Sequence, residues 1–328
     1  MEEELAIQTL NKYYLDSIIK PYLESEKVID LHSHTNYSDG ELSPMDLIRH
    51  AIECRIDTLA ITDHDTLNGI KSINRNDKLI VDSGIKIIDG IELTAQPIKG
   101  TMHILGYNID KDNKELNEIM TKLKNSSTNR TLSIMEQIKR DYGIIFSHED
   151  IKELINSNHN LGRPDLAKLC IKYGYANSVQ DAFNKYLIDA YNKTLTVNKR
   201  LSYEECIRLI TNANGVPVLA HPKTLELTEE ELTILIEQMV ECGLKGIEAY
   251  HSSHTKEEMQ MYLNIAKKYN LLVSVGSDYH GPNVKPNVHL GSGVNDNLNI
   301  TLIFQSINKI TVSKKTPPYV FHFINCIF

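Results

Sequence analysis

The sequence predicts an α/β fold in which parallel strands are separated by helices, with an all-helical segment inserted. The first observation is a series of short runs rich in apolar and β-branched residues, at 28–34, 58–64, 85–94, 102–109, 216–221, 246–251 and 271–278. The second is that stretches with helical periodicity lie between these runs, and strands that alternate with helices form parallel sheets. The third is that residues 111–200 offer only helical periods, so we expect an insertion there.

Helix starts between the strands are marked by capping boxes. Ser202, Thr228 and Thr255 are each followed by a glutamate three positions later. In this arrangement the two side chains satisfy backbone N–H groups that the first helical turn leaves unpaired. We therefore expect helices to begin at these three residues and to connect successive strands.

The two ends of the sequence differ from the α/β body. Residues 1–26 carry apolar side chains at helical spacing and predict an N-terminal helix. Residues 316–328 form an apolar tail that is too short to cross a bilayer. We expect this tail to pack on the body, with a subunit contact or an exposed apolar end as the alternatives.

The composition is that of an ordinary globular protein, with 41% hydrophobic and 24% charged residues among 328. The 35 basic and 43 acidic side chains give a formal net charge of −8, so we expect neither a long nucleic acid nor a membrane as partner. The acidic first residues lack the features of a secretory signal, which favours a cytoplasmic location. The five scattered cysteines favour reduced thiols over disulfides. The oligomeric state is left open.

Histidines and carboxylates gather at the ends of the predicted strands. In the run 28–34, side chains alternate between faces, which places Asp30, His32 and His34 on the same face. Two imidazoles on one strand face suit a metal ion better than an apolar core, where unpaired polar atoms are costly. Later strand ends carry further polar residues, namely His64, Asp65, Glu92, His103, His221, His251, Asp278 and His280.

Each of these residues alone has an ordinary explanation as a turn residue or a hydrogen-bonded core group. Asp39, for example, lies in a Ser-Asp-Gly sequence that is typical of a turn. Together, nitrogen and oxygen side chains from five or six strand ends indicate a cluster of divalent metal ions. The carboxyl ends of the strands are also where parallel α/β folds build their sites.

The motifs around these residues resemble those of the PHP family, which is named for its polymerase and histidinol phosphatase members. They are DLHSHTNYSDG at 30–40, TDHDT at 62–66, GIELTA at 90–95 with MHILGY at 102–107, LAHP at 219–222 and GSDYHG at 276–281. The resemblance implies a distorted (β/α)7 barrel formed by residues 27–110 and 201–315, with residues 111–200 as a helical lid. It also implies a site with two or usually three divalent metal ions, commonly manganese, iron or zinc.

The resemblance further implies roles for particular residues. The metal-ligand positions of the family fall on His32, His34, Asp39, His64, Glu92, His103, His221, Asp278 and His280. In the subgroup that resembles nucleotide and oligoribonucleotide phosphoesterases, an arginine of the insertion binds substrate phosphate, and Arg163 lies at a similar position. Here Pro164-Asp165 replaces the more familiar Thr-His, and an ordinary exposed arginine is the alternative.

Three further residues are candidates for a part in the reaction. Asp65 and His251 are both candidates for donating a proton to the leaving group, and the sequence does not decide between these two residues. His254 follows in the same HSSH segment as His251, and we expect it either to contact substrate phosphate or to support the residues that hold the metal ions.

The expected activity is hydrolysis of phosphate esters at a multinuclear metal centre, with a bridging hydroxide as nucleophile. The leading substrates are nucleoside 3′,5′-bisphosphates or the 5′ ends of short oligonucleotides. One alternative is a histidinol-phosphate-type or other small-metabolite phosphatase. An alternative of another class is a non-catalytic metal-binding regulatory module. Nucleic-acid binding without hydrolysis is disfavoured, because the sequence has no tryptophan and no basic stripe with interleaved aromatic residues.

Overall fold

A computed structural model describes residues 28–157, 159–194 and 200–298. Its strands form one sheet in sequence order, made of β1 Val28–Asp30, β2 Ile56–Ile61, β3 Lys86–Ala95, β4 Met102–Tyr107, β5 Val216–Leu219, β6 Gly246–His251 and β7 Leu272–Gly276. Just beyond β1, the backbone N–H of Leu31 donates to the carbonyl oxygen of Val275 at 3.0 Å, which joins the first strand to the last. The sheet is therefore a nearly closed barrel of seven strands, as predicted.

One strand runs against the expected direction. The pairs β1/β2, β2/β3, β5/β6 and β6/β7 are parallel, whereas β4 is antiparallel to both β3 and β5. Only residues 96–101 connect β3 to β4, and a connection this short joins antiparallel strands, because a parallel pair needs a crossover. The expectation of parallel strands was wrong at β4.

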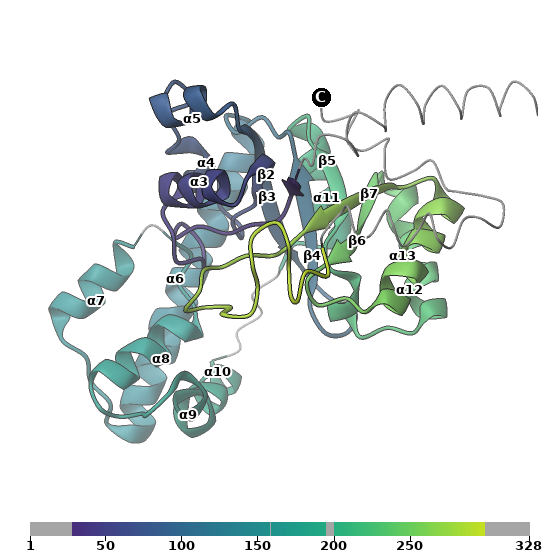
Figure 1. The fold of residues 1–328 in the computed structure, drawn as a ribbon. Helices are drawn as coiled ribbons and strands as arrows, with labels where there is room; N and C mark the ends of the chain where they lie inside the picture. The colour runs from purple at the N-terminus through teal and green to yellow at the C-terminus, as the bar shows by residue number, and fades with distance from the viewer. Residues whose placement is uncertain (1–27, 158, 195–199, 299–328) are drawn as a thin grey trace, which may run out of the picture.

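Helices surround the barrel (Figure 1). Those of the first part are α3 Pro44–Glu53, α4 Asn68–Lys71 and α5 Lys78–Ser83, and those of the last part are α11 Tyr203–Asn212, α12 Glu229–Glu241 and α13 Lys256–Tyr269. The capping boxes predicted at Ser202, Thr228 and Thr255 are all present at the starts of α11, α12 and α13. Apolar side chains such as Leu59 and Ile104 are fully buried between strands and helices. They hold the strands in a fixed frame for the residues at their ends.

A lobe of helices separates β4 from β5 and extends away from the barrel (Figure 1). It consists of α6 Lys114–Tyr142, α7 His148–Ile155, α8 Arg163–Lys172, α9 Val179–Ala182, a π-helical turn at Phe183–Leu187 and α10 Ile188–Lys193. The lobe has its own apolar cluster, which includes Ile134, Ile138, Leu166 and Leu187. It touches the barrel where the side-chain amide of Asn160 donates to the carbonyl oxygen of Asp65 at 3.1 Å, just beyond β2.

Some of the segments predicted from the sequence lie outside the described residues. These are the N-terminal helix at 1–26, the apolar tail at 316–328 and the part of the barrel segment beyond residue 298. Within the described part of the chain, no helix is long and apolar enough to cross a membrane. The described cysteines, Cys54, Cys170, Cys206 and Cys242, carry free thiols. The cytoplasmic location stays a prediction.

Candidate metal centre

The carboxylate of Glu92, in β3, is the meeting point of five imidazoles from four other strands or strand ends. Its Oε2 atom lies 3.2 Å from a ring nitrogen of each of His32, His34 and His64. Its Oε1 atom lies 2.9 Å from Nδ1 of His103 and 2.9 Å from Nε2 of His221. Glu92 is completely buried, so a single carboxylate organises five imidazoles inside the mouth of the barrel.

Asp278, which follows β7, is the second carboxylate shared by several groups. Its Oδ1 atom lies 3.2 Å from Nε2 of His34 and 3.3 Å from Nδ1 of His280. Its Oδ2 atom lies 3.4 Å from Nε2 of His251 and 2.6 Å from Nζ of Lys285. Asp278 therefore joins the end of β1 to the end of β6 and to the loop after β7.

Asp39 lies at the exposed edge of the same cluster, on the turn that follows β1. Its carboxylate oxygens are 3.3 Å from Nε2 of His280 and 3.8 Å from Nε2 of His64. The turn is tight, because a Cβ atom at Gly40 would lie only 2.4 Å from the carbonyl oxygen of His34. The close approach that only glycine allows here brings Asp39 to the histidines.

His221 and Asp278 have backbone conformations that are uncommon for residues with a side chain. Their φ angles are +23° and +58°. The N–H of His221 donates to Oε2 of Glu248 at 2.8 Å, and the N–H of Asp278 donates to the carbonyl oxygen of His32 at 2.9 Å. Conformations of this kind cost about 1–3 kcal/mol each and persist where the surroundings hold them. These bonds keep both side chains in the centre.

Sequence reasoning missed two residues that hold the predicted ones in place. Glu248, in β6, is completely buried and accepts a hydrogen bond from Nδ1 of His32 at 3.0 Å. Asp63 is buried next to His64 and accepts hydrogen bonds from the N–H of Thr35 and the hydroxyl of Ser38, both at 2.7 Å. Glu248 had a usable signal, because it is a carboxylate within an apolar strand, as Glu92 is.

The charges of the centre are coupled. Burial acts to lower the pKa of His34, but the neighbouring carboxylates of Asp278 and Glu92, each 3.2 Å from its Nε2 atom, outweigh this effect and raise the pKa to about 9. Burial acts to raise the pKa of Glu92, yet the nearby rings of His64 and His32 hold it well below its usual range. The carboxylates thus attract positive charge, which either protons on the imidazoles or divalent cations can supply.

Buried polar atoms indicate which kind of group fits the centre. Five of its atoms are buried without a hydrogen-bond partner, namely Nε2 of His32, His34 and His251, Nδ1 of His64 and Oε2 of Glu92. Leaving such an atom unsatisfied costs about 1–3 kcal/mol. The cluster therefore suits a bound group that accepts lone pairs from nitrogen and oxygen, as a metal cation does. Ligand atoms within 4.8 Å of one another form four groups, which are His34/Asp39/His64/His280, His32/His34/Glu92, His64/Glu92/His103 and His32/Glu248/His251. Imidazole nitrogens with carboxylate oxygens fit divalent transition-metal ions.

The structure thus brings all nine predicted metal-ligand residues into one cluster, and His251 joins them. The other two candidates of the barrel lie at its border. Asp65 follows His64, and its Oδ1 atom accepts a hydrogen bond from the N–H of Thr94 at 2.8 Å. His254 is only 4% exposed, its Nδ1–H donates to the carbonyl oxygen of Ala249 at 3.0 Å, and its ring packs on Tyr262. His254 therefore lies behind His251.

Arg163 lies in the helical lobe, at the start of α8. Its guanidinium carbon is 4.2 Å from the centre of the Tyr191 ring and 5.4 Å from that of Phe183. Among the described residues it forms no ion pair. Asp165 is the residue that departs from the more familiar Thr-His pair. Its carboxylate accepts hydrogen bonds from the N–H of Gly162 and from Nε2 of His159, both at 2.9 Å, and so stabilises the start of α8.

A seven-stranded barrel with a cluster of histidines and carboxylates at its strand ends defines a barrel with a site suited to metal ions. The chain matches the PHP domain over residues 30–277 and belongs to the PHP family. It is 31% identical to 5′-3′ exoribonuclease Rnm of Escherichia coli (strain K12) over 258 residues, which cover 78% of this chain and 86% of the relative. It is 30% identical to a 5′-3′ exoribonuclease of Haemophilus influenzae, with 78% and 91% covered.

Two further comparisons involve Chromobacterium violaceum and Bifidobacterium adolescentis. The chain is 26% identical to a 3′,5′-nucleoside bisphosphate phosphatase of the first organism, over 77% of this chain and 87% of the relative. A solved structure from the second, assigned to the metal-dependent phosphoesterases, has a TM-score of 0.66 and 27% identity, with 84% and 96% covered. Given its family and these relatives, the chain is a hydrolase that acts on phosphate ester bonds.

A second solved structure from Chromobacterium violaceum, described as an amidohydrolase with bound sulfate, has a TM-score of 0.63. It is 26% identical, and the match covers 77% of this chain and 88% of that chain. Both solved structures support the barrel architecture.

Proposed function

We propose that this chain hydrolyses phosphate esters of nucleotides, either nucleoside 3′,5′-bisphosphates or the 5′ ends of short oligonucleotides, with bound divalent metal ions. The observation that carries the proposal is the convergence of five imidazoles on the buried carboxylate of Glu92. The substrate class is supported by the relatives, which are named as 5′-3′ exoribonucleases and as a nucleoside bisphosphate phosphatase. In this proposal residues 27–110 and 201–315 form the catalytic barrel and residues 111–200 the lid.

The proposed ligands of the metal ions are His32, His34, Asp39, His64, Glu92, His103, His221, Asp278 and His280. The overlapping groups of these side chains support three ions, and their nitrogen and oxygen donors suit manganese, iron or zinc. Such ions lower the pKa of bound water and neutralise charge on phosphate. The contribution of Glu248 is to hold the ring of His32 through Nδ1, which leaves Nε2 facing the centre.

In the reaction, a water molecule gives up one proton to the solvent as its oxygen bonds to phosphorus, and the bond from phosphorus to the leaving oxygen breaks. The leaving oxygen then takes up a proton, for which Asp65 and His251 remain the candidates. Burial raises the pKa of Asp65, which favours the protonated carboxyl that a donor needs. Arg163 is proposed to bind a phosphate of the substrate with its guanidinium group. A phosphate contact by His254 stays a prediction, and its burial favours support of His251 instead.

The test is release of inorganic phosphate from adenosine 3′,5′-bisphosphate by the Mn²⁺-loaded protein, with a chelated sample in the same run. A panel adds a 5′-phosphorylated trinucleotide, a sugar phosphate and an amino-alcohol phosphate such as histidinol phosphate. We expect metal-dependent turnover with kcat/KM highest for the nucleotides. Preference for the sugar or amino-alcohol phosphate would replace the proposal by a small-metabolite phosphatase. A metal-loaded protein that turns over none of them would overturn the proposed substrate class.

A further inference from the structure

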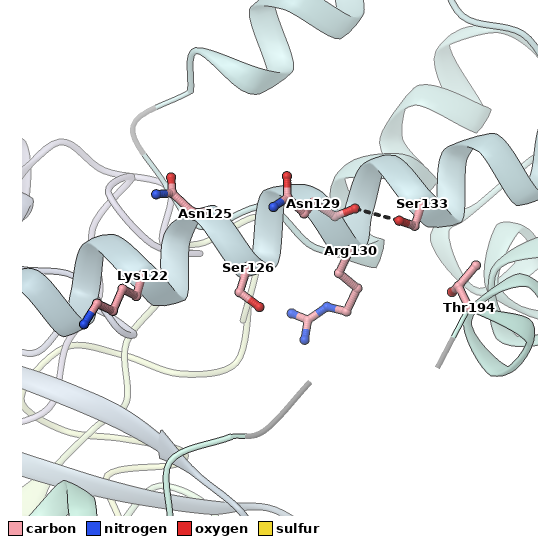
Figure 2. Close-up of a pocket in the computed structure, with 7 residues that line it drawn as sticks. All are labelled: Lys122, Asn125, Ser126, Asn129, Arg130, Ser133 and Thr194. Carbon is pink, nitrogen blue, oxygen red and sulfur yellow. Dashed lines mark hydrogen bonds between the residues drawn. The ribbon is translucent and has the colours of Figure 1, made fainter. Parts of the chain in front are cut away.

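A polar pocket lies along α6 in the helical lobe, outside the metal centre (Figure 2). Its volume of about 370 Å³ is within the range of pockets that hold small ligands. Two adjacent rows of side chains on α6 line it, each spaced by four residues so that its members share a face of the helix. The rows are Lys122, Ser126 and Arg130, and Asn125, Asn129 and Ser133. No carboxylate is among the described lining residues.

The pocket is connected to the border of the metal centre by a short series of contacts. The guanidinium of Arg130 lies 3.4 Å from the hydroxyl of Ser127. That hydroxyl donates to the carbonyl oxygen of Leu161, and the side-chain amide of the preceding residue, Asn160, donates to the carbonyl oxygen of Asp65 at 3.1 Å. Because Asp65 follows directly after His64, these contacts place Arg130 near the border of the metal centre.

Positive charge collects at the end of the pocket near the metal centre. Arg163 and Arg200 lie close enough to influence Arg130, and none of the three forms an ion pair within the described part of the chain. Burial lowers the pKa of Arg130 and the charges of Arg200 and Arg163 act in the same direction, while the charge of Asp65 acts weakly against them. Neighbouring cations that form no ion pair among the described residues are expected where an anionic ligand binds.

The outer part of the pocket offers groups of a different kind. The ammonium of Lys122 and the side-chain amides of Asn125 and Asn129 have no partner among the described residues, and all three side chains are exposed. An amide both donates and accepts, as recognition of ribose hydroxyls and base edges requires. From Lys122 to Arg130 the helix rises by about 12 Å, so the two cations can meet successive phosphates rather than one.

We propose that this pocket binds the second nucleotide of an oligoribonucleotide whose 5′-terminal nucleotide lies at the metal centre. The inference rests on the proposed function and narrows it, because it makes an oligonucleotide a better substrate than a nucleoside bisphosphate. Arg130 binds the phosphodiester nearest the centre, Lys122 binds the next phosphate outward, and Asn125 with Asn129 binds ribose and base between them.

The kinetic test compares kcat/KM for a 5′-phosphorylated trinucleotide with kcat/KM for adenosine 3′,5′-bisphosphate, in the wild type and in the double variant Asn125→Ala/Asn129→Ala. We expect the ratio of trinucleotide to bisphosphate to fall by about 10-fold in the double variant, since two hydrogen-bonding groups are lost. Lys139→Ala, an exposed lysine on the same helix outside the pocket, is the matched control. A ratio that does not change in the double variant would overturn the inference.

A binding test separates failure of the inference from failure of the proposed function. A fluorescent trinucleotide with a non-hydrolysable methylene phosphonate linkage is titrated into the metal-loaded protein, and its anisotropy is measured at several salt concentrations. The inference expects weaker binding by the double variant and, for Lys122→Ala, a salt slope smaller by about one phosphate contact. If the wild type hydrolyses neither substrate, the proposed function fails, and this titration alone decides whether the pocket binds the oligonucleotide. Equal binding by wild type and both variants would overturn the inference.

Discussion

Glu248 accepts a hydrogen bond from Nδ1 of His32 at 3.0 Å, while its other carboxylate oxygen accepts from the backbone N–H of His221 at 2.8 Å. One buried carboxylate in β6 thus orients a histidine at the end of β1 and fixes the backbone of another at the end of β5. Because its partner atom on His32 is Nδ1, the Nε2 atom of that ring is directed at Glu92, 3.2 Å away. Glu248 acts on the centre through the geometry of its neighbours.

The first prediction concerns this carboxylate. Glu248→Gln keeps the size of the side chain but removes its charge, so His32 loses the partner that orients its ring and increases its basicity. We expect metal affinity to fall roughly 10–100-fold, the usual cost of losing such a partner. Metal affinity would be measured by competition with a chromogenic chelator, and folding by circular dichroism. Glu237→Gln, at an exposed position of α12, is the control. Unchanged affinity in a folded Glu248→Gln protein would contradict this role.

The second prediction concerns Asp278, whose two oxygens lie within 3.6 Å of five different side chains. Asp278→Ala should abolish turnover and release metal, with a loss of metal affinity larger than the roughly 10–100-fold expected for an outer partner. The fold should persist, because the barrel core is formed by apolar residues elsewhere. Elemental analysis after gel filtration would measure the metal content, alongside the phosphate-release assay. Full metal content together with retained turnover would exclude Asp278 as a ligand.

The third prediction concerns Lys285, whose ammonium lies 2.6 Å from Oδ2 of Asp278 and whose side chain is 36% exposed. A cation at this position competes with a metal ion for the charge of the carboxylate. Lys285→Ala should therefore tighten metal binding a few-fold, since a partly exposed ion pair is worth about 0–1 kcal/mol. It should also raise KM for phosphorylated substrates, because a positive charge beside the centre is lost.

Lys285→Arg keeps the charge and is the matched control for both measurements. If Lys285→Ala weakens metal binding instead, the lysine supports the position of Asp278 rather than competing with the ion. Isothermal titration calorimetry with Mn²⁺ measures directly whether metal affinity rises or falls, and it requires no turnover.

Several features of the site were predictable because they depend on local sequence patterns. His32 and His34 follow from the alternation of side chains along an extended run, and Glu92 from a carboxylate inside an apolar strand. The same signal was present at Glu248, but its significance depends on its distance from His32, which lies 216 positions away in the sequence. Contacts of that kind are set by the closure of the barrel.

Two other features were not predicted, for different reasons. The side-chain pattern of β4 is the same in either direction, and the available signal, a connection at 96–101 too short for a crossover, was overlooked. Arg130 has the sequence pattern of an ordinary surface arginine on a helix, and only its proximity to Arg163 and Arg200 distinguishes it. The arrangement of the helical lobe therefore had to come from the structure.

The last prediction concerns stability with and without metal. Five atoms of the centre are buried without hydrogen-bond partners, and ions that bind them in the folded state alone shift the folding equilibrium. One such ion at a free concentration 100 times its dissociation constant stabilises the fold by about 2.7 kcal/mol. We expect thermal unfolding in excess chelator to occur several degrees below that in Mn²⁺, and the gap to widen as Mn²⁺ is raised. Asp278→Ala, which loses a ligand, should show a smaller gap in the same titration. Sodium chloride at matched ionic strength controls for screening, and an unfolding temperature that does not depend on Mn²⁺ concentration would mean that the cluster holds no ion in the folded state.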